Sequence, residues 1–301
     1  SMIRKPLGIC ISMAFAISLA VAGEVSPSRA NLTAAEVVDK NVAARGGLQA
    51  WRAVQTMSLT GKLTAGGNQR TALPVPMPDR KANKRSSKMT LPPRPSEEVQ
   101  LPFVMELKRS RKMRMELQFN GQTALQVFDG TNGWKLRPFL NRREVEPYTT
   151  DELKSTSTQA ELDGFLVDYA AKGTRIELAG MEKVEDRDAY KLKLTLKNGQ
   201  AMHVWIDAQT FLEAKIEGQP RRLDGTYHPV EVYYRDYRPV NGLQIPHVLE
   251  TRVLPVNQPA AASKGAPVQA EKIMVEKVVV NPKLDESHFS KPETGLAPKT
   301  N

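Results

Sequence analysis

Cysteine is almost absent from this sequence. Cys10 is the only cysteine among 301 residues, and it lies close to the start of the chain. Disulfides therefore do not hold the protein together, and a chain of this length can rely on a hydrophobic core instead. Aromatic residues are also scarce, at 6% of the chain. Membrane-spanning β-barrels carry aromatic girdles at both interfaces, so the composition argues against that class.

The sequence also lacks the spacings that mark common catalytic and metal sites. Its histidines, His203, His228, His247 and His288, lie in four separate segments without a metal-binding spacing. No G-x-S-x-G elbow, phosphate-binding loop or dinucleotide fingerprint occurs. We therefore expect a protein that is not an enzyme and that needs no cofactor or metal. An active site assembled across strands is the alternative, because it would leave no such motif.

The first thirty residues have the anatomy of a secretory signal peptide. Arg4 and Lys5 precede an uncharged, mostly apolar run at residues 7–23, and small residues offer cleavage sites after Ala22 or Ala30. The run is short for a membrane span, although an uncleaved anchor is the alternative. The sequence predicts a periplasmic protein whose mature chain contains no cysteine.

Positive charge is concentrated in one stretch. The net charge is +10, and residues 70–114 contain twelve basic and four acidic residues. A local excess argues against nucleic acid as a partner and favours contact with anionic lipid head groups, with a solvated loop as the alternative. The candidate membrane-contacting residues are Arg80, Lys81, Lys84, Arg85 and Lys88.

Alternation of apolar and polar side chains is the strongest pattern in the chain. In residues 227–254 it runs on both sides of Asn241-Gly242, a dipeptide typical of antiparallel hairpins. The same alternation recurs from residue 57 to residue 280 and predicts about eleven strands. Residues 71–102 hold seven prolines and many charges, which predicts a long loop, and residues 291–301 form a polar tail.

Two capping boxes predict helices. Thr33 and Glu36 begin one that ends at Gly46-Gly47, and Thr158 and Glu161 begin another at residues 159–172. The second would carry one apolar stripe, made of Leu162, Phe165, Leu166 and Tyr169. A large antiparallel sheet must curl, close or be covered, and this stripe is the available cover.

Three segments together form a pattern shared with a known family: QVFDGTNGWKLRP at residues 126–138, AELDGFLVDYAAKG at residues 160–173 and DYRPVNGLQIPHVLETR at residues 236–252. In this order they resemble the LolA-like family of outer-membrane lipoprotein-sorting proteins. The resemblance covers most of residues 33–289. It implies one domain at residues 31–290, mainly β with a few helices (α+β). That domain would be a strongly curved antiparallel half-barrel lidded by helices, with a concave apolar face that receives acyl chains.

The resemblance also implies roles for individual residues. Cavity candidates on the apolar strand faces are Leu59, Met113, Met115, Leu117, Leu192, Leu194, Val204 and Ile206, with a closed core as the alternative. The stripe described above would be the lid. Family carriers hold the lid closed with an arginine near the start of the strand meander, which bonds to the lid backbone. Arg109 or Arg111 could fill that role here.

These features together lead to one functional expectation and one alternative. We expect a periplasmic carrier without enzymatic activity, which binds lipid or the acyl chains of lipoproteins in the concave face. The family's pattern of a basic residue followed by proline is missing near Arg109. The alternative is therefore a LolA-like sensor that binds a protein partner in envelope-stress signalling.

Overall fold

A computed structural model describes residues 31–65, 99–138, 142–256 and 267–293. The chain divides into two units, residues 1–32 and residues 33–301, and the fold below belongs to the second unit. The predicted signal peptide and the five candidate membrane-contacting residues lie outside the described residues. Most of the predicted loop at residues 71–102 also lies outside them.

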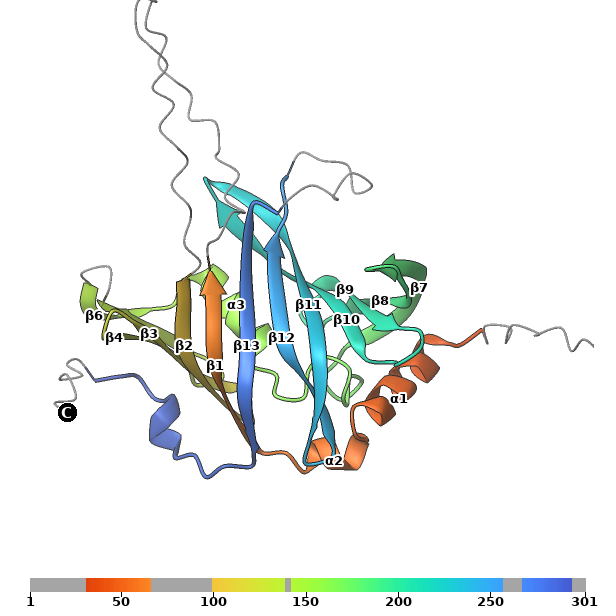
Figure 1. Cartoon of the computed structure of the whole chain (residues 1–301), viewed down its shortest axis with the longest axis horizontal. Coiled ribbons are helices and arrows are strands. Elements are labelled where there is room, and N and C mark those ends of the chain that lie inside the picture. Colours follow the sequence, from red (N-terminus) through yellow and green to blue (C-terminus); the bar gives the residue numbers. More distant parts are fainter. Residues whose placement is uncertain (1–30, 66–98, 139–141, 257–266, 294–301) are drawn as a thin grey trace, which may run out of the picture. The chain divides into compact units, whose positions relative to one another are not determined.

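Thirteen antiparallel strands form one sheet in the described ranges. The strands are β1 (Thr56–Ala65), β2 (Val99–Lys108), β3 (Lys112–Phe119), β4 (Gln122–Phe128), β5 (Gly133–Arg137), β6 (Arg142–Pro147), β7 (Arg175–Val184), β8 (Arg187–Thr195), β9 (Ala201–Asp207), β10 (Glu213–Leu223), β11 (Thr226–Val240), β12 (Leu243–Val253) and β13 (Gln269–Val280). Their order is β6-β5-β4-β3-β2-β1-β13-β12-β11-β10-β9-β8-β7, so β6 and β7 are the edges and the sheet stays open. Figure 1 shows β1 beside β13, where the first and last strands meet.

This architecture confirms the prediction of a mainly β protein with an open, curved antiparallel sheet. The strand count was too low, because the sheet has thirteen strands and not about eleven. One strand without a predicted counterpart is β6, which has the charged sequence RREVEP. The loop prediction was also too long at its end. Residues 99–102 belong to β2, and Pro102 is the register partner of Lys62 on β1.

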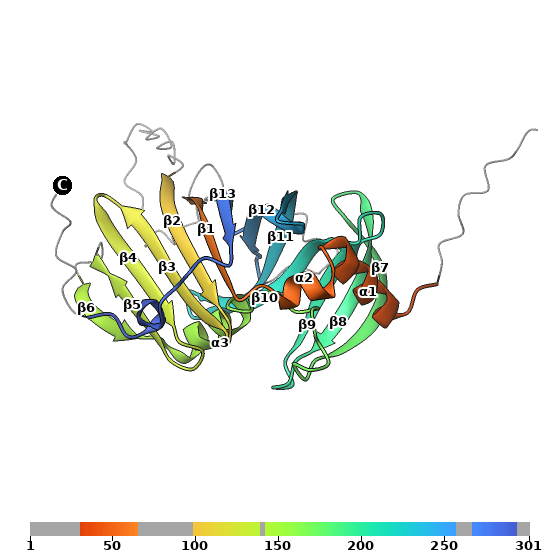
Figure 2. The same cartoon turned by 90° about the horizontal axis from the view of Figure 1, so that it is seen from below.

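The sheet bends at defined irregularities. The register of β1 and β13 shifts between Thr60 and Gly61. A Cβ atom at Gly61 would lie 1.9 Å from the carbonyl oxygen of Met274, so this close approach requires glycine. Further shifts occur on β10, against β9 and against β11. Such irregularities bend and twist a sheet, and Figure 2 shows the resulting concave side.

Three α-helices and one short 3₁₀ helix accompany the sheet in the described residues. They are α1 (Ala34–Ala44), α2 (Leu48–Arg52), α3 (Thr150–Gln159) and η3 (Glu286–Phe289). The capping box of Thr33 and Glu36 begins α1 as predicted. No helix in the described ranges is long and apolar enough to cross a membrane.

The predicted helix at residues 159–172 is wrong. The α-helix in this region ends at Gln159, and its capping box joins Thr149 to Glu152. Residues 161–173 form a series of turns instead. Gly164 has a φ of +78° and Asp168 a φ of +52°, and the left-handed backbone at these two residues interrupts a helix.

Helix α1 covers the β7 end of the concave side. Its buried stripe contains Val37, Val38 and Val42, and the helix contacts β7 (Figure 2). The Asn41 side-chain amide donates a hydrogen bond to the Phe211 carbonyl oxygen at 2.8 Å, in the turn between β9 and β10. The Phe211 ring stacks on Tyr190 of β8, with 5.9 Å between the ring centroids. This end of the sheet is therefore closed by packed side chains.

Candidate functional site

A cavity of about 680 Å³ lies against the concave face of the sheet. Its other wall is made by α3 and residues 161–166. We call α3 together with residues 161–173 the cover. Strands from both halves of the sheet contribute lining residues, including Leu59 of β1, Val204 of β9 and Tyr234 of β11. The volume is within the range of small-molecule binding sites.

Methionines dominate one wall of the cavity. Met105 of β2 is the register partner of both Met115 of β3 and Leu59 of β1, and Met113 pairs with Leu107. Met57, Met105, Met113 and Met115 all line the cavity. We call this surface on β1–β3 the methionine wall. Methionine has a flexible, polarisable side chain, so such a wall can adapt to apolar ligands of different shape.

The structure separates the eight predicted cavity residues into two groups. Leu59, Met113, Met115 and Val204 line the cavity, whereas Leu117, Leu192, Leu194 and Ile206 do not. Leu117 shares the concave face through its register with Phe103, but it is half-buried and lies outside the set of lining residues.

Leu192, Leu194 and Ile206 are fully buried, each with 0% exposure. Their register partners include Val204 and Met202, which line the cavity, so all five side chains are on the concave face. We call the three fully buried residues the leucine wall. Because none of the three side chains is exposed or lines the cavity, we describe the leucine wall as core.

The cover presents both apolar and polar groups to the cavity. Leu162, Phe165 and Leu166 of the predicted lid stripe line it, but Tyr169 does not. Helix α3 contributes Ser155, Thr156, Thr158 and Gln159. The cavity thus has an apolar methionine wall on β1–β3, whereas the cover combines apolar side chains with hydroxyl and amide groups.

Comparison with known proteins identifies the architecture. No protein-family model matches the sequence, and no curated protein matches it. The solved structure of a LolA superfamily protein from Nitrosomonas europaea is similar, with a TM-score of 0.51 and 13% identity, covering 86% of this chain and 98% of that chain. The chain has a LolA-like fold.

Two further structures are similar at lower TM-scores. A protein described as an outer membrane lipoprotein-sorting domain, from Vibrio parahaemolyticus, has a TM-score of 0.48 and 14% identity, covering 86% of this chain and 96% of that chain. A DUF1329 family protein from Desulfovibrio piger has a TM-score of 0.48 and 13% identity, covering 84% of this chain and 95% of that chain.

In this LolA-like fold, the cover is held between its two ends by a charge cluster around the buried Asp163. The Asp163 side chain is 2% exposed, and its carboxylate accepts hydrogen bonds from Arg109 Nη1 at 2.9 Å and from Lys172 Nζ at 2.6 Å. Arg109 also donates to the carbonyl oxygens of Val54 at 2.6 Å and Trp51 at 2.8 Å. Arg109 therefore joins the cover to the segment around α2.

The two predicted latch residues differ in their contacts. Arg109 contacts the cover through the carboxylate of Asp163. The backbone carbonyl groups that accept its other hydrogen bonds belong to the α2 region and not to the cover. Arg111 Nε lies 3.9 Å from Glu161 Oε1, which is too long for a hydrogen bond. Arg45, which the sequence did not single out, donates to the Asp163 carbonyl oxygen at 2.9 Å.

Other ion pairs and hydrogen bonds hold the cover at its two ends. Near Gly173, Arg52 makes two hydrogen bonds to Asp168, at 2.6 and 3.0 Å, and these bonds lower the pKa of Asp168. In the first turn of α3, Glu152 pairs with Lys135 of β5. The neighbouring Asp151 accepts a hydrogen bond from Tyr227 Oη of β11 at 2.8 Å. Helix α3 is thus bonded to both halves of the sheet.

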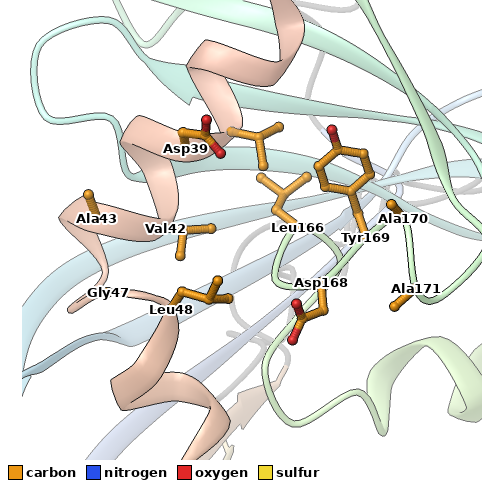
Figure 3. Close-up of a pocket in the computed structure, with 11 residues that line it drawn as sticks. Asp39, Val42, Ala43, Gly47, Leu48, Leu166, Asp168, Tyr169, Ala170 and Ala171 are labelled. Atoms are coloured by element: carbon orange, nitrogen blue, oxygen red, sulfur yellow. The ribbon is translucent and has the colours of Figure 1, made fainter.

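A second hollow lies outside the cavity, between α1 and residues 166–171 (Figure 3). Val42 and Leu48 come from the helical side of this groove, and Tyr169 from the cover. Its volume is about 560 Å³. Leu166 lines both the groove and the cavity, so one side chain separates the two spaces.

Proposed function

We propose that this protein is a non-enzymatic periplasmic carrier that binds lipid, or the acyl chains of acylated lipoproteins, in the cavity under the cover. The observation that carries the proposal is the cavity itself, an apolar space between the methionine wall and a cover that ion pairs hold in place. Burial of acyl chains contributes about 0.8 kcal/mol per methylene, so affinity does not require a specific polar contact.

The proposed location depends on the first thirty residues. Their charge and hydropathy pattern supports export with signal cleavage after Ala22 or Ala30. N-terminal sequencing of the protein recovered from the periplasm would identify the mature start. A start at Ser1 or Met2 would contradict this part of the proposal.

Two measurements test the carrier function. Native mass spectrometry of protein purified from its own periplasm should detect a co-purified lipid or acylated peptide. Uptake of a fluorescent acyl probe should fall in a Met115→Asp variant, because a carboxylate would enter the apolar wall. The matched control is Gln118→Asp, because Gln118 is on the same strand but is exposed and does not line the cavity. Equal loss of uptake in both variants, or none in either, would contradict the site.

A sensor that binds a protein partner in envelope-stress signalling is the second candidate. The groove beside α1 favours it, because Leu166 borders both this groove and the ligand cavity (Figure 3). If the protein is a sensor, lipid in the cavity should change amide exchange in α1 and at residues 166–171. Exchange that is unchanged by lipid would leave the carrier as the better explanation.

Contact with an anionic membrane is a separate part of the proposal. It rests on the sequence of Arg80, Lys81, Lys84, Arg85 and Lys88, since each basic residue near an anionic surface contributes about 1 kcal/mol. Binding to anionic vesicles should weaken as salt is raised and should disappear when all five residues are neutralised. Vesicle binding that survives neutralisation would place the contact elsewhere.

A further inference from the structure

The charged groups on the cavity wall are unevenly distributed. Of the described residues that line the cavity, two are cationic and five are acidic: Arg45, Arg221, Glu152, Glu161, Glu213, Glu217 and Glu271. Each of the five carboxylates has a basic neighbour: Lys135 for Glu152, Lys172 for Glu161, Arg45 for Glu213, His203 for Glu217 and Arg221 for Glu271. Among the described lining residues, an anionic ligand would therefore meet carboxylates and no cation without a partner. Carboxylates at short range disfavour a further negative charge in a poorly solvated site.

Both arginines already have partners. Arg45 donates to the Asp163 carbonyl oxygen at 2.9 Å, and its guanidinium lies 4.2 Å from the centre of the Trp51 ring. Arg221 pairs with Glu271 at 2.9 Å. A ligand carboxylate or phosphate would have to displace one of these contacts, or leave its own charge without a partner at considerable cost.

Uncharged hydrogen-bonding groups on the wall are, by contrast, available. Tyr234 lines the cavity, and its hydroxyl makes no hydrogen bond with the described residues. Burial and the nearby Glu213 carboxylate raise the pKa of Tyr234, so the hydroxyl stays protonated and can donate. Gln126, Gln244 and Thr251 add neutral side-chain groups to the same wall.

We infer that the cavity selects uncharged amphiphiles, in which acyl chains end in ester, amide or hydroxyl groups, and discriminates against free fatty-acid anions. The inference rests on the proposed function, since it specifies which acyl compounds the cavity accepts. The apolar chain would lie on the methionine wall, and Tyr234 would donate to an uncharged oxygen of the head group. Acyl glycerols and the acylated N-terminus of a lipoprotein share this chemistry.

Ligands of equal chain length test the inference. Calorimetry would measure the binding of three ligands to the intact mature protein at pH 8. They are dodecanoate, 1-dodecanoylglycerol and a peptide whose N-terminal cysteine carries an N-dodecanoyl group and an S-linked didodecanoylglyceryl group. Dodecanoylglycerol should bind at least about tenfold more tightly than dodecanoate, because the anion loses hydration without gaining a cation. At pH values above the pKa of dodecanoic acid, each unit by which the pH is lowered should raise the affinity for dodecanoate by up to about tenfold. The affinity for dodecanoylglycerol should not change.

Variants locate the selection in the cavity. Tyr234→Phe should weaken dodecanoylglycerol binding about three- to tenfold by removing a hydrogen-bond donor. Tyr233→Phe is the matched control, because Tyr233 lies outside the cavity lining and its hydroxyl donates to Glu231. Gln126→Lys, which places an unpaired cation on an exposed part of the lining, should strengthen dodecanoate binding.

The outcomes separate this inference from the proposed function. Dodecanoate that binds as tightly as dodecanoylglycerol at pH 8, or binds independently of pH, would overturn the selection and leave an acyl carrier. Absence of binding by all three ligands would overturn both. If the two neutral ligands bind more tightly than dodecanoate, the selection holds. Tighter binding of dodecanoylglycerol would then indicate a free lipid as the natural ligand, and tighter binding of the acylated peptide would indicate a lipoprotein.

Discussion

The methionine wall and the leucine wall belong to the same face of the same sheet, yet one borders a cavity and the other is sealed. Met115 is half-buried and lines the cavity, whereas Leu192 has no exposed surface. The strands that carry them alternate apolar and polar residues in the same way. What differs is the surroundings of each wall, because α3 brings polar residues to the cavity that the first borders, whereas α1 contacts β7 with its valines buried at the end of the sheet that carries the second.

This comparison shows that a cavity is defined by both of its sides. An apolar strand face becomes core when apolar side chains cover it fully, and α1 brings its buried Val37 and Val38 to the β7 end of the sheet. Ser155, Thr156 and Thr158 of α3 cannot fill a space of this size with apolar atoms. A space therefore persists over the methionine wall, where a ligand can supply the missing contacts.

The largest expected effect comes from mutating the two walls in parallel. Leu192→Ala should lower the free energy of unfolding by about 2–5 kcal/mol, because it leaves a void in packed core. Met115→Ala should cost less than about 1.5 kcal/mol, since its side chain already borders open space. Urea denaturation would measure both. Equal losses would show that the methionine wall is also closed core.

Aspartate substitutions make the same contrast sharper. Leu192→Asp buries a charge without a partner and should prevent folding, whereas Met115→Asp should fold and lose acyl-probe uptake. Circular dichroism separates the two results. A folded Leu192→Asp protein would contradict the assignment of the leucine wall as core.

The next effect concerns Asp163, which holds the cover over the cavity. Asp163→Asn should lower the free energy of unfolding by about 2–3 kcal/mol, because it leaves Arg109 and Lys172 without their carboxylate and solvent screens part of the loss. Amide exchange at residues 161–173 should accelerate. Glu161→Gln is the control, because Glu161 lies 3.7 Å from Lys172 in a looser contact. If both variants lose a similar free energy of unfolding, Asp163 does not hold the cover more strongly than Glu161 does.

The sheet could be predicted from the sequence because its signals are local. Alternation and turn dipeptides such as Asn241-Gly242 depend on neighbouring residues, and they placed most strands correctly. The strand β6 was missed because RREVEP offers only Val145 as an apolar residue between charges. Its pairing with β5 at the sheet edge compensates for this weak pattern.

The helix of the cover was misplaced in the prediction because this region of the sequence contains two capping-box patterns. The pattern from Thr149 to Glu152 forms, and the one from Thr158 to Glu161 does not. Gly164 and Asp168 interrupt the apolar stripe, and their left-handed backbone is stabilised by tertiary contacts that sequence spacing does not reveal. The Asp163 cluster was missed for the same reason, since Arg109 is 54 residues from Asp163 in the chain.

A smaller effect is the acid sensitivity of the turn beneath α1. Asp207 is partly buried, which raises its pKa, but hydrogen bonds from Arg187 and from the Thr210 and Gln209 amides outweigh burial and lower the pKa to about 2. The folded protein therefore binds this proton less readily than the unfolded chain. The stabilisation is present above about pH 4 and is lost as the pH falls towards 2.

Asp207→Asn tests this dependence. At pH 7 the variant should be less stable by about 1–2 kcal/mol, and the difference from the unmodified protein should shrink between pH 4 and pH 2. Thermal unfolding at several pH values would measure it. A difference that is constant with pH would mean that the side-chain geometry matters and the charge does not.

The smallest expected effect asks whether the methionine wall needs methionine. Met115→Leu conserves volume, so the free energy of unfolding should change by less than about 1 kcal/mol. Leucine is branched and has fewer rotatable bonds, so the wall should adapt less well to a kinked chain. We therefore expect the affinity ratio between a straight and a cis-unsaturated acyl glycerol to increase. Competition with a fluorescent acyl probe would measure that ratio, with Leu59→Met as the reciprocal control on the same wall. If the ratio is the same in all three proteins, the cavity accepts chains by its volume alone, and the methionines differ from leucine only in packing.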